Sequence, residues 1–158
     1  MSEFVSPEDG RYDDRERQLV RIGEEAIAVG DEPKLNAYFA SGYKFSGPDG
    51  AMNFEQVKAF FASMRAALTD FKCQRREVIS EGELIAAQTS MSGVFENTFQ
   101  SAMVGPVKPN GQKVTLELMN FFRYTPEGLL IEEWVEYDNV NFLKQLGVDL
   151  VAAYKAQR

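Results

Sequence analysis

The stretch that decides the fold reads GLLIEEWVEYD and occupies Gly128–Asp138. It is short, rich in β-forming residues and preceded by the turn sequence Thr125–Gly128, so we predict a strand. Side chains alternate between the two faces of a strand. One predicted face carries Leu130, Glu132, Trp134, Glu136 and Asp138, and the other carries Ile131, Glu133, Val135 and Tyr137. Neither face is uniformly apolar, so the stretch is not a plain core strand.

The first of these faces places the only tryptophan beside several carboxylates. Trp134 is two residues from Glu132 and Glu136 and four residues from Asp138. An apolar wall raises the pKa of a neighbouring carboxyl group by desolvation, which makes that group a usable acid or base. The alternative is a half-exposed strand with solvated acids. Asp138 also precedes a predicted short helix at 139–146, where it would be a favoured helix cap.

The preceding strand is predicted at Lys113–Tyr124, and it carries an amide on an otherwise apolar face. Asn120 alternates in register with Leu116, Leu118, Phe122 and Tyr124. A buried amide without a hydrogen-bond partner costs about 1–3 kcal/mol. The partner of Asn120 is therefore another side chain or an oxygen of a bound ligand.

Helical patterns come first in the chain, and strands follow. Helices are predicted at 12–29, 31–42 and 54–68, a hairpin at 71–80 and 84–94, a loop at 105–111 and a weakly helical tail at 149–158. This order favours an α+β domain with helices packed on one face of an antiparallel sheet. We predict a flexible N-terminal arm at 1–11 and a single domain at 12–158.

Composition excludes several function classes. The chain has 158 residues and a net charge of −7, which disfavours nucleic acid or an anionic membrane as the main partner. Arg75 and Arg76 form the one obvious basic pair in its middle. Neither a secretory signal nor a membrane-spanning run is visible, so a cytoplasmic location is predicted. Twelve phenylalanines exceed what packing requires, and the surplus is available to line an apolar cavity.

The absence of histidine is informative. It excludes histidine-based nucleophile triads, imidazole metal sites and histidine proton shuttles. The single cysteine, Cys73, excludes an internal disulfide and a CxxC cluster and is predicted to be a core residue. A carboxylate metal site at Glu132, Glu136 and Asp138 has only their spacing in its favour. No cofactor and no metal are predicted.

Four segments carry a family resemblance. FSGPDG (45–50), QVKAFFASMRAALTDFKC (56–73), NGQKVTLELMNFFRYTPEGLLIEEWVEYD (110–138) and FLKQLGV (142–148) resemble the SnoaL-like polyketide cyclases of the nuclear-transport-factor-2-like superfamily. The resemblance implies a cone: a strongly curved antiparallel sheet wrapped by N-terminal helices around an apolar pocket. It also implies a homodimer formed across the outer face of the sheet.

The resemblance further implies site residues. Family cyclases use an aspartate on the last strand as the general acid/base of a cofactor-free aldol condensation, and Asp138 resembles that aspartate. Asn120 matches a polar pocket position and is the second candidate catalytic residue. Ser46 and Phe95 stand where relatives often carry histidine. The candidate substrate-binding residues are Trp134, Tyr43, Phe60, Met64, Leu118, Phe122 and Glu136.

These observations predict a cofactor-independent enzyme that uses acid/base chemistry on a hydrophobic, carbonyl-containing small molecule, by aldol condensation or isomerisation. Asp138 would remove a proton, and Asn120 or Tyr43 would stabilise the enolate oxygen. Two alternatives remain open. One is a non-catalytic small-molecule-binding or dimeric interaction protein of the same fold. The other is a hydrolase or dehydratase that pairs Glu132 or Glu136 with Asp138.

Overall fold

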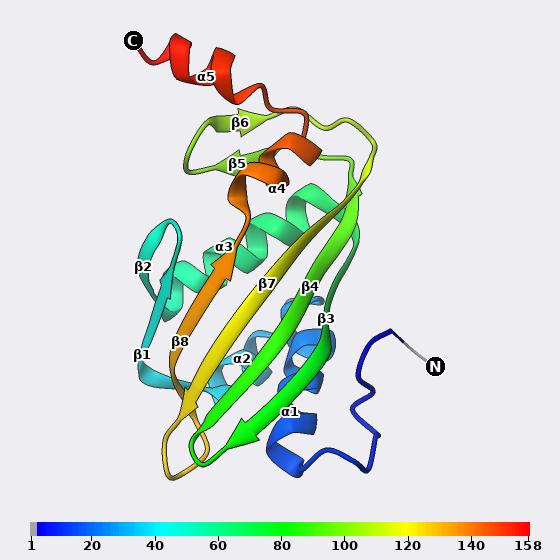
Figure 1. The fold of residues 1–158 in the computed structure, drawn as a ribbon, viewed down its shortest axis with the longest axis vertical. Coiled ribbons are helices and arrows are strands. Elements are labelled where there is room, and N and C mark those ends of the chain that lie inside the picture. Colours follow the sequence, from blue (N-terminus) through cyan, green and yellow to red (C-terminus); the bar gives the residue numbers. More distant parts are fainter. Residues whose placement is uncertain (1–2) are drawn as a thin grey trace.

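The structure, a computed structural model, describes residues 3–158. A six-stranded sheet in the order β2-β1-β8-β7-β4-β3 and a two-stranded hairpin, β5–β6, are combined with helices (Figure 1). The elements are α1 (Asp14–Ile22), the π-helical turn η1 (Gly23–Ile27), α2 (Glu32–Tyr38), β1 (Phe39–Gly47), β2 (Gly50–Asn53), α3 (Phe54–Ala67), β3 (Leu68–Glu81), β4 (Leu84–Phe95), β5 (Phe99–Ser101), β6 (Gly105–Val107), β7 (Lys113–Tyr124), β8 (Leu130–Tyr137), α4 (Asn139–Gln145) and α5 (Leu150–Ala156).

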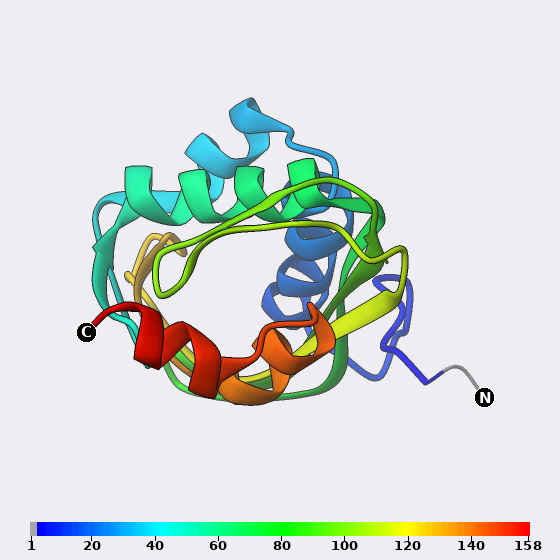
Figure 2. The same ribbon diagram turned by 90° about the horizontal axis from the view of Figure 1, so that it is seen from above.

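The long strands form a curved sheet around which the helices are placed. Figure 2 shows α1 and α3 facing the sheet across the interior, with α4 near the end of the sheet from which the view is taken. The main core lies between them and includes fully buried Leu19, Met64, Ile85 and Val114. This is the α+β architecture predicted from the sequence, and the prediction is confirmed.

Local sequence signals account for the ends of several elements. Asn53 caps α3, and its side chain accepts a hydrogen bond from the backbone amide of Gln56. The Gln56 side chain accepts one from the backbone amide of Asn53, which completes a capping box. Asp13 and Glu16 form the same motif at the start of α1. The predicted bounds of β7, Lys113–Tyr124, are those observed.

Two predictions about local structure are wrong. The helix predicted to extend to Gly42 ends at Tyr38, because Phe39 adopts an extended conformation and its ring stacks on Phe54 with centroids 4.5 Å apart. The predicted loop at 105–111 begins with strand β6, which pairs with β5. The predicted antiparallel sheet is observed in four of the five strand pairs, and β1 runs parallel to β8.

The segment predicted as an arm lies along β3 in its described part. Val5 is buried, and its amide donates a hydrogen bond to the carbonyl oxygen of Arg75 at 2.8 Å. Glu3 forms an ion pair with Arg76. These contacts cover part of the outer edge of β3, which is the last strand of the sheet. Within residues 3–158, no helix is both long and apolar enough to cross a membrane.

Candidate functional site

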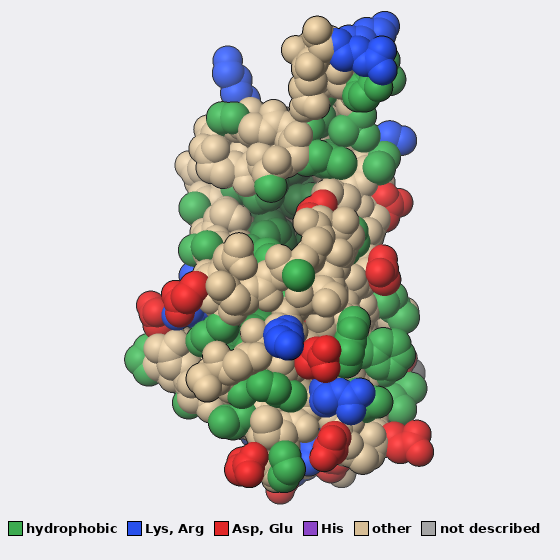
Figure 3. All heavy atoms as spheres, turned by 90° about the vertical axis from the view of Figure 1, so that its left-hand side faces the viewer, with side chains coloured by type: hydrophobic (Ala, Val, Ile, Leu, Met, Phe, Trp, Pro, Cys, Tyr) green, Lys and Arg blue, Asp and Glu red, His purple; other side chains and the backbone are tan. Residues whose placement is uncertain are grey.

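A cavity of about 370 Å³ lies between the inner face of the sheet and the helices. Its volume is in the range of small-molecule sites. In Figure 3 the surface is hollowed on one side, and hydrophobic side chains gather inside the hollow. The apolar wall combines side chains from helices and strands: Leu19, Ile22, Phe45, Met52, Phe60, Phe61, Met91, Leu116, Leu118, Phe122, Val135 and Phe142.

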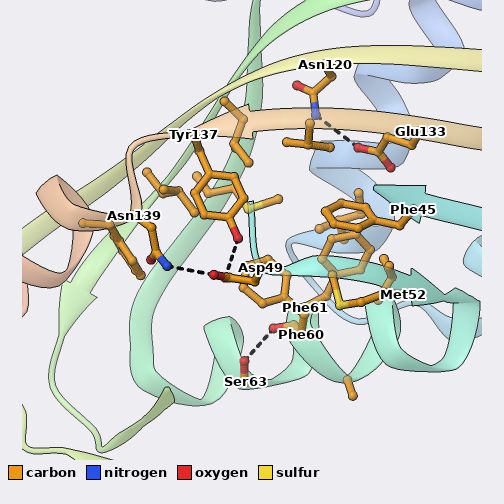
Figure 4. A pocket seen from close by; sticks show the side chains of 18 of the residues that line it. Phe45, Asp49, Met52, Phe60, Phe61, Ser63, Asn120, Glu133, Tyr137 and Asn139 are labelled. Carbon is orange, nitrogen blue, oxygen red and sulfur yellow. Dashed lines mark hydrogen bonds between the residues drawn. The ribbon is translucent and has the colours of Figure 1, made fainter. Parts of the chain in front are cut away.

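A buried carboxyl group faces this cavity from β8. Glu133 lines the cavity and is only 8% exposed. Its Oε2 accepts a hydrogen bond from the Tyr43 hydroxyl at 2.6 Å. Its Oε1 accepts one from Asn120 Nδ2 at 3.1 Å, which is drawn in Figure 4. Both partners are buried, so the carboxyl group is held in one orientation.

The contact to Asn120 continues across the sheet. Thr89 Oγ1 donates to Asn120 Oδ1 at 2.6 Å, and Arg75 Nη1 donates to Thr89 Oγ1. We call the set Tyr43, Glu133, Asn120, Thr89 and Arg75 the polar relay. Its members come from β1, β8, β7, β4 and β3, one from each of five neighbouring strands. Because each is less than a tenth exposed, the relay is a hydrogen-bonded polar band inside an apolar core.

Burial sets the protonation behaviour of the relay. It raises the pKa of Glu133 above its ordinary value, while the Tyr43 hydrogen bond, the Arg75 charge and the Asn120 hydrogen bond act in the opposite direction. The pKa of the Tyr43 hydroxyl is also raised, by burial and then by the charge of Glu133. Tyr43 is therefore a neutral donor, and Glu133 is a carboxyl group shifted towards the range useful for proton transfer.

A second polar pair lies in the same interior. The hydroxyls of Tyr38 and Tyr124 share a hydrogen bond, and Tyr38 lines the cavity. Burial raises the pKa of both hydroxyls. Each neutral hydroxyl has one proton to donate, and one of the two protons forms the bond between Tyr38 and Tyr124. The other proton is available for a hydrogen bond to a ligand oxygen.

The exposed rim of the cavity carries another carboxylate. Asp49 lies between β1 and β2 and accepts hydrogen bonds from Tyr137 Oη at 2.8 Å and Asn139 Nδ2 at 3.1 Å. All three residues line the cavity (Figure 4). These bonds join the β1–β2 hairpin to the end of β8 and the start of α4. The contact therefore fixes one side of the entrance.

The structure brings only part of the predicted site together. Asn120, Phe60, Leu118 and Phe122 line the cavity. Tyr43 does not line it, because the residue lies behind Glu133 and donates its hydroxyl proton to that carboxyl group.

Met64 also lies outside the cavity lining, in the fully buried core. Two further sequence predictions concern single residues. Cys73 is a buried core residue, as predicted. Arg75 and Arg76 do not form one basic patch, because Arg75 is buried in the cavity wall and Arg76 contacts Glu3 and Glu117 outside it.

The prediction that Trp134, Glu136 and Asp138 of β8 face the cavity is wrong. Trp134 and Glu136 line a shallow groove on the outer side of the sheet, with Arg123 placed over the Trp134 ring. Asp138 is exposed and is absent from the cavity lining, and its Oδ1 accepts the amide of Asn141 at 2.8 Å. The helix-cap interpretation of Asp138 is thus the one observed.

A β-bulge explains the reversal. Tyr124 pairs with Leu130, but Arg123 pairs with Glu132, so Ile131 is an extra residue on β8. One extra residue moves every following side chain to the opposite face. Simple alternation counted from Leu130 therefore selects Trp134, whereas the structure directs Glu133 and Val135 to the side of Asn120.

Sequence reasoning also missed Arg75, Tyr38 and Asp49 as lining residues. The signal for Glu133 is the pairing of Asn120 with Val135, because directly opposite residues of an antiparallel pair share a face. Glu133 is two residues from Val135 on the same strand and therefore lies on that face as well. That signal requires the register, which the bulge conceals. Within residues 3–158, no group of three or more acidic or cysteine side chains is arranged to hold a metal ion. The carboxylate metal site considered from spacing therefore has no geometric support.

A curved sheet with an apolar cavity and a buried acid defines a class of small-molecule pocket proteins. A family model described as SnoaL-like polyketide cyclase matches residues 17–146. The chain belongs to the SnoaL-like polyketide cyclase family. Family and fold together support a cyclase- or isomerase-like function. A comparison with curated proteins gives no match.

Solved structures show the same fold at low sequence identity. IdmH of Streptomyces antibioticus, a candidate polyketide cyclase, is 21% identical with a TM-score of 0.70, over 86% of this chain and 100% of its own. AclR of Streptomyces galilaeus, a candidate hydroxylase, is 16% identical with a TM-score of 0.71, over 84% and 95%. A candidate SnoaL-like polyketide cyclase of Jannaschia sp. CCS1 is 19% identical with a TM-score of 0.71, over 85% and 92%.

Proposed function

We propose that the protein is a cofactor-independent acid/base enzyme that acts next to a carbonyl group of a hydrophobic small molecule. The observation that carries the proposal is Glu133, a carboxyl group buried in the wall of an apolar cavity and oriented by Tyr43 and Asn120. Burial raises its pKa, so its conjugate base is stronger than that of a solvated glutamate.

Glu133 replaces Asp138 in this proposal. Asp138 lies outside the cavity lining and is engaged as a helix cap. Glu133 has two oxygens, and each accepts one protein hydrogen bond. Since a carboxylate oxygen has two lone pairs, a lone pair on each oxygen stays available for a substrate proton.

The reaction begins when the Glu133 carboxylate removes a proton from the carbon next to a carbonyl group. The C–H electron pair moves into an enolate, whose oxygen accepts a hydrogen bond from Tyr38 or Asn120. In a cyclisation, the enolate carbon attacks a second carbonyl of the same molecule, and the resulting alkoxide takes the proton back from Glu133. In an isomerisation, Glu133 returns the proton to a different carbon.

Deuterium exchange tests this proposal without knowledge of the natural substrate. The probes are 2-tetralone and 5-androstene-3,17-dione in D₂O, with loss of the proton signals next to the carbonyl followed by NMR. We expect the wild type to accelerate exchange, and Glu133→Gln to lose about 10²–10⁴-fold of that acceleration. Glu136→Gln, on the outer face, and Asp138→Asn, which retains a good helix cap, are the matched controls.

Undiminished exchange in Glu133→Gln would remove Glu133 from the mechanism. Loss of exchange in Asp138→Asn alone would restore the aspartate predicted from the sequence. No acceleration by the wild type with either ketone would favour a binding protein instead. That alternative has one observation in its favour, because each oxygen of Glu133 already has a protein donor.

We also propose that two copies of the chain associate through the outer face of the sheet. The family resemblance implies this arrangement, and the groove on that face contains exposed apolar side chains. Ile79, Met119 and Phe121 are each more than half exposed. Exposed apolar groups gathered in one patch are typical of an interaction surface.

A further inference from the structure

Arg75 is a buried cation in the wall of the cavity. It is 3% exposed, and its guanidinium lies over the Phe122 ring with the carbon atom Cζ 5.3 Å from the ring centroid. A charged side chain in such a position is costly unless another charge or several hydrogen bonds compensate for it. The contacts of Arg75 therefore decide what this charge does.

The protein only partly satisfies this guanidinium. Within residues 3–158, Arg75 has no carboxylate within ion-pairing distance, its Nη1 donates to Thr89, and its buried Nε has no acceptor. An arginine carries five N–H donors in a planar fork. Arg75 thus brings unused donors and a positive charge to a wall that is otherwise mostly apolar.

The donors are held in a fixed position in the buried wall of the cavity. The Thr89 contact and the Phe122 ring hold the guanidinium, and Leu19 and Ile22 of α1 line the cavity in the same interior. Asp49 marks the exposed rim. A ligand that fills the cavity therefore meets both the exposed rim and the buried part of the wall to which Arg75 belongs.

We propose that Arg75 binds an anionic oxygen of the substrate, so that the natural ligand is a hydrophobic molecule bearing a carboxylate or an ionised enolate. This inference rests on the proposed use of the cavity as the substrate site. A planar guanidinium pairs two oxygens at once, and charge-assisted hydrogen bonds are about twice as strong as neutral ones. The ligand oxygens accept hydrogen bonds from guanidinium donors that no protein group uses.

Binding alone tests this assignment. Naphthalene-2-carboxylate is compared with its neutral methyl ester, and ionised 2-acetylindane-1,3-dione with its neutral O-methyl ether, by NMR titration at neutral pH. We expect the wild type to bind at least one anion about tenfold or more tightly than its neutral counterpart. The pair that shows the preference distinguishes a carboxylate from an enolate. The Nε–H signal of Arg75, assigned by its absence in Arg75→Lys, is expected to shift with that anion.

Arg75→Met should reduce the preference to less than about twofold while the neutral compounds still bind. Arg76→Met is the matched control, because it is the same substitution at the adjacent residue outside the cavity, and it should keep the full preference. Should Arg75→Met fail to fold, the proposal is still tested by the wild type alone, through its affinities for the anion and the neutral compound and through the shift of the Nε–H signal. Equal binding of anion and neutral compound by the wild type, with no Nε–H shift, would overturn the proposal and leave Arg75 as compensation for Glu133.

These outcomes are separate from the test of the proposed function. Loss of anion preference in Arg75→Met, together with full deuterium exchange in Glu133→Gln, would support the ligand class and reject the catalytic base. The opposite pair of results would keep Glu133 as the base and reject the anion site.

Discussion

Each face of the β7–β8 pair carries residues of the kind that is usual on the opposite face of a half-buried sheet. On the inner face, Asn120 and Glu133 are buried and bonded to each other. On the outer face, Met119 is 57% exposed and Phe121 is 56% exposed. Antiparallel sheets commonly bury the apolar face and expose the polar one. Polar groups retained inside and apolar groups retained outside both have a cost, and this cost is consistent with the proposed ligand site on the inner face and the proposed association surface on the outer face.

The largest effect on stability is expected from breaking the inner face. Asn120→Ala removes the link between Thr89 and Glu133, so that in the core the Thr89 hydroxyl proton loses its acceptor and Glu133 Oε1 loses its donor. We expect the free energy of unfolding to fall by about 1–3 kcal/mol, measured by urea denaturation. Met119→Ala, one residue away on the outer face, is the control and should change it by less than about 0.5 kcal/mol. Equal losses in the two variants would mean that the relay is not a stabilising network.

The pH dependence of stability should also identify the inner face. Because the pKa of Glu133 is raised in the folded state, the folded state holds this proton more tightly than the unfolded chain does. The contribution to stability is complete below the ordinary value of 4.5 and is lost as the pH rises through the raised pKa. The unfolding free energy of the wild type minus that of Glu133→Gln should therefore fall as the pH is raised above the ordinary value of 4.5. A difference that rises or stays constant over this range would contradict a raised pKa.

The outer face should respond mainly through association. Phe121→Lys places a charge in the exposed apolar groove, so we expect it to shift a dimer towards monomer in light scattering coupled to size exclusion. The unfolding free energy of the monomer should change by less than about 0.5 kcal/mol, because the residue is exposed. A wild type that is monomeric at high micromolar concentration would contradict the association proposed for this face.

Sequence reasoning predicted the parts of the fold that depend on local patterns. The alternation of apolar and polar residues predicted the bounds and the inner face of β7, and the capping pair Asn53 and Gln56 predicted the start of α3. The buried amide Asn120 was identified as a site residue for the same reason, since one polar residue interrupts an apolar face. These signals lie within one element and need no knowledge of its neighbours.

The remaining parts of the site depend on long-range geometry. The extra residue Ile131 reversed the faces of β8, so reasoning by alternation selected Trp134 and Asp138 and missed Glu133. Arg75 and Arg76 are adjacent on a strand and therefore lie on opposite faces, but only the packing of β3 determines which of the two is buried. The hydrogen bond between Tyr43 and Glu133 joins residues 90 positions apart. No local pattern specifies such a contact.

The most direct test of the central claim is an NMR titration of the Glu133 carboxyl carbon. The signal is assigned by its absence in Glu133→Gln and followed from about pH 3 to pH 9. The account predicts a midpoint above the ordinary glutamate value of 4.5, displaced further when a ligand fills the cavity. A midpoint at or below 4.5, unchanged by any ligand, would show a solvated carboxylate and would contradict a buried acid/base at the centre of this site.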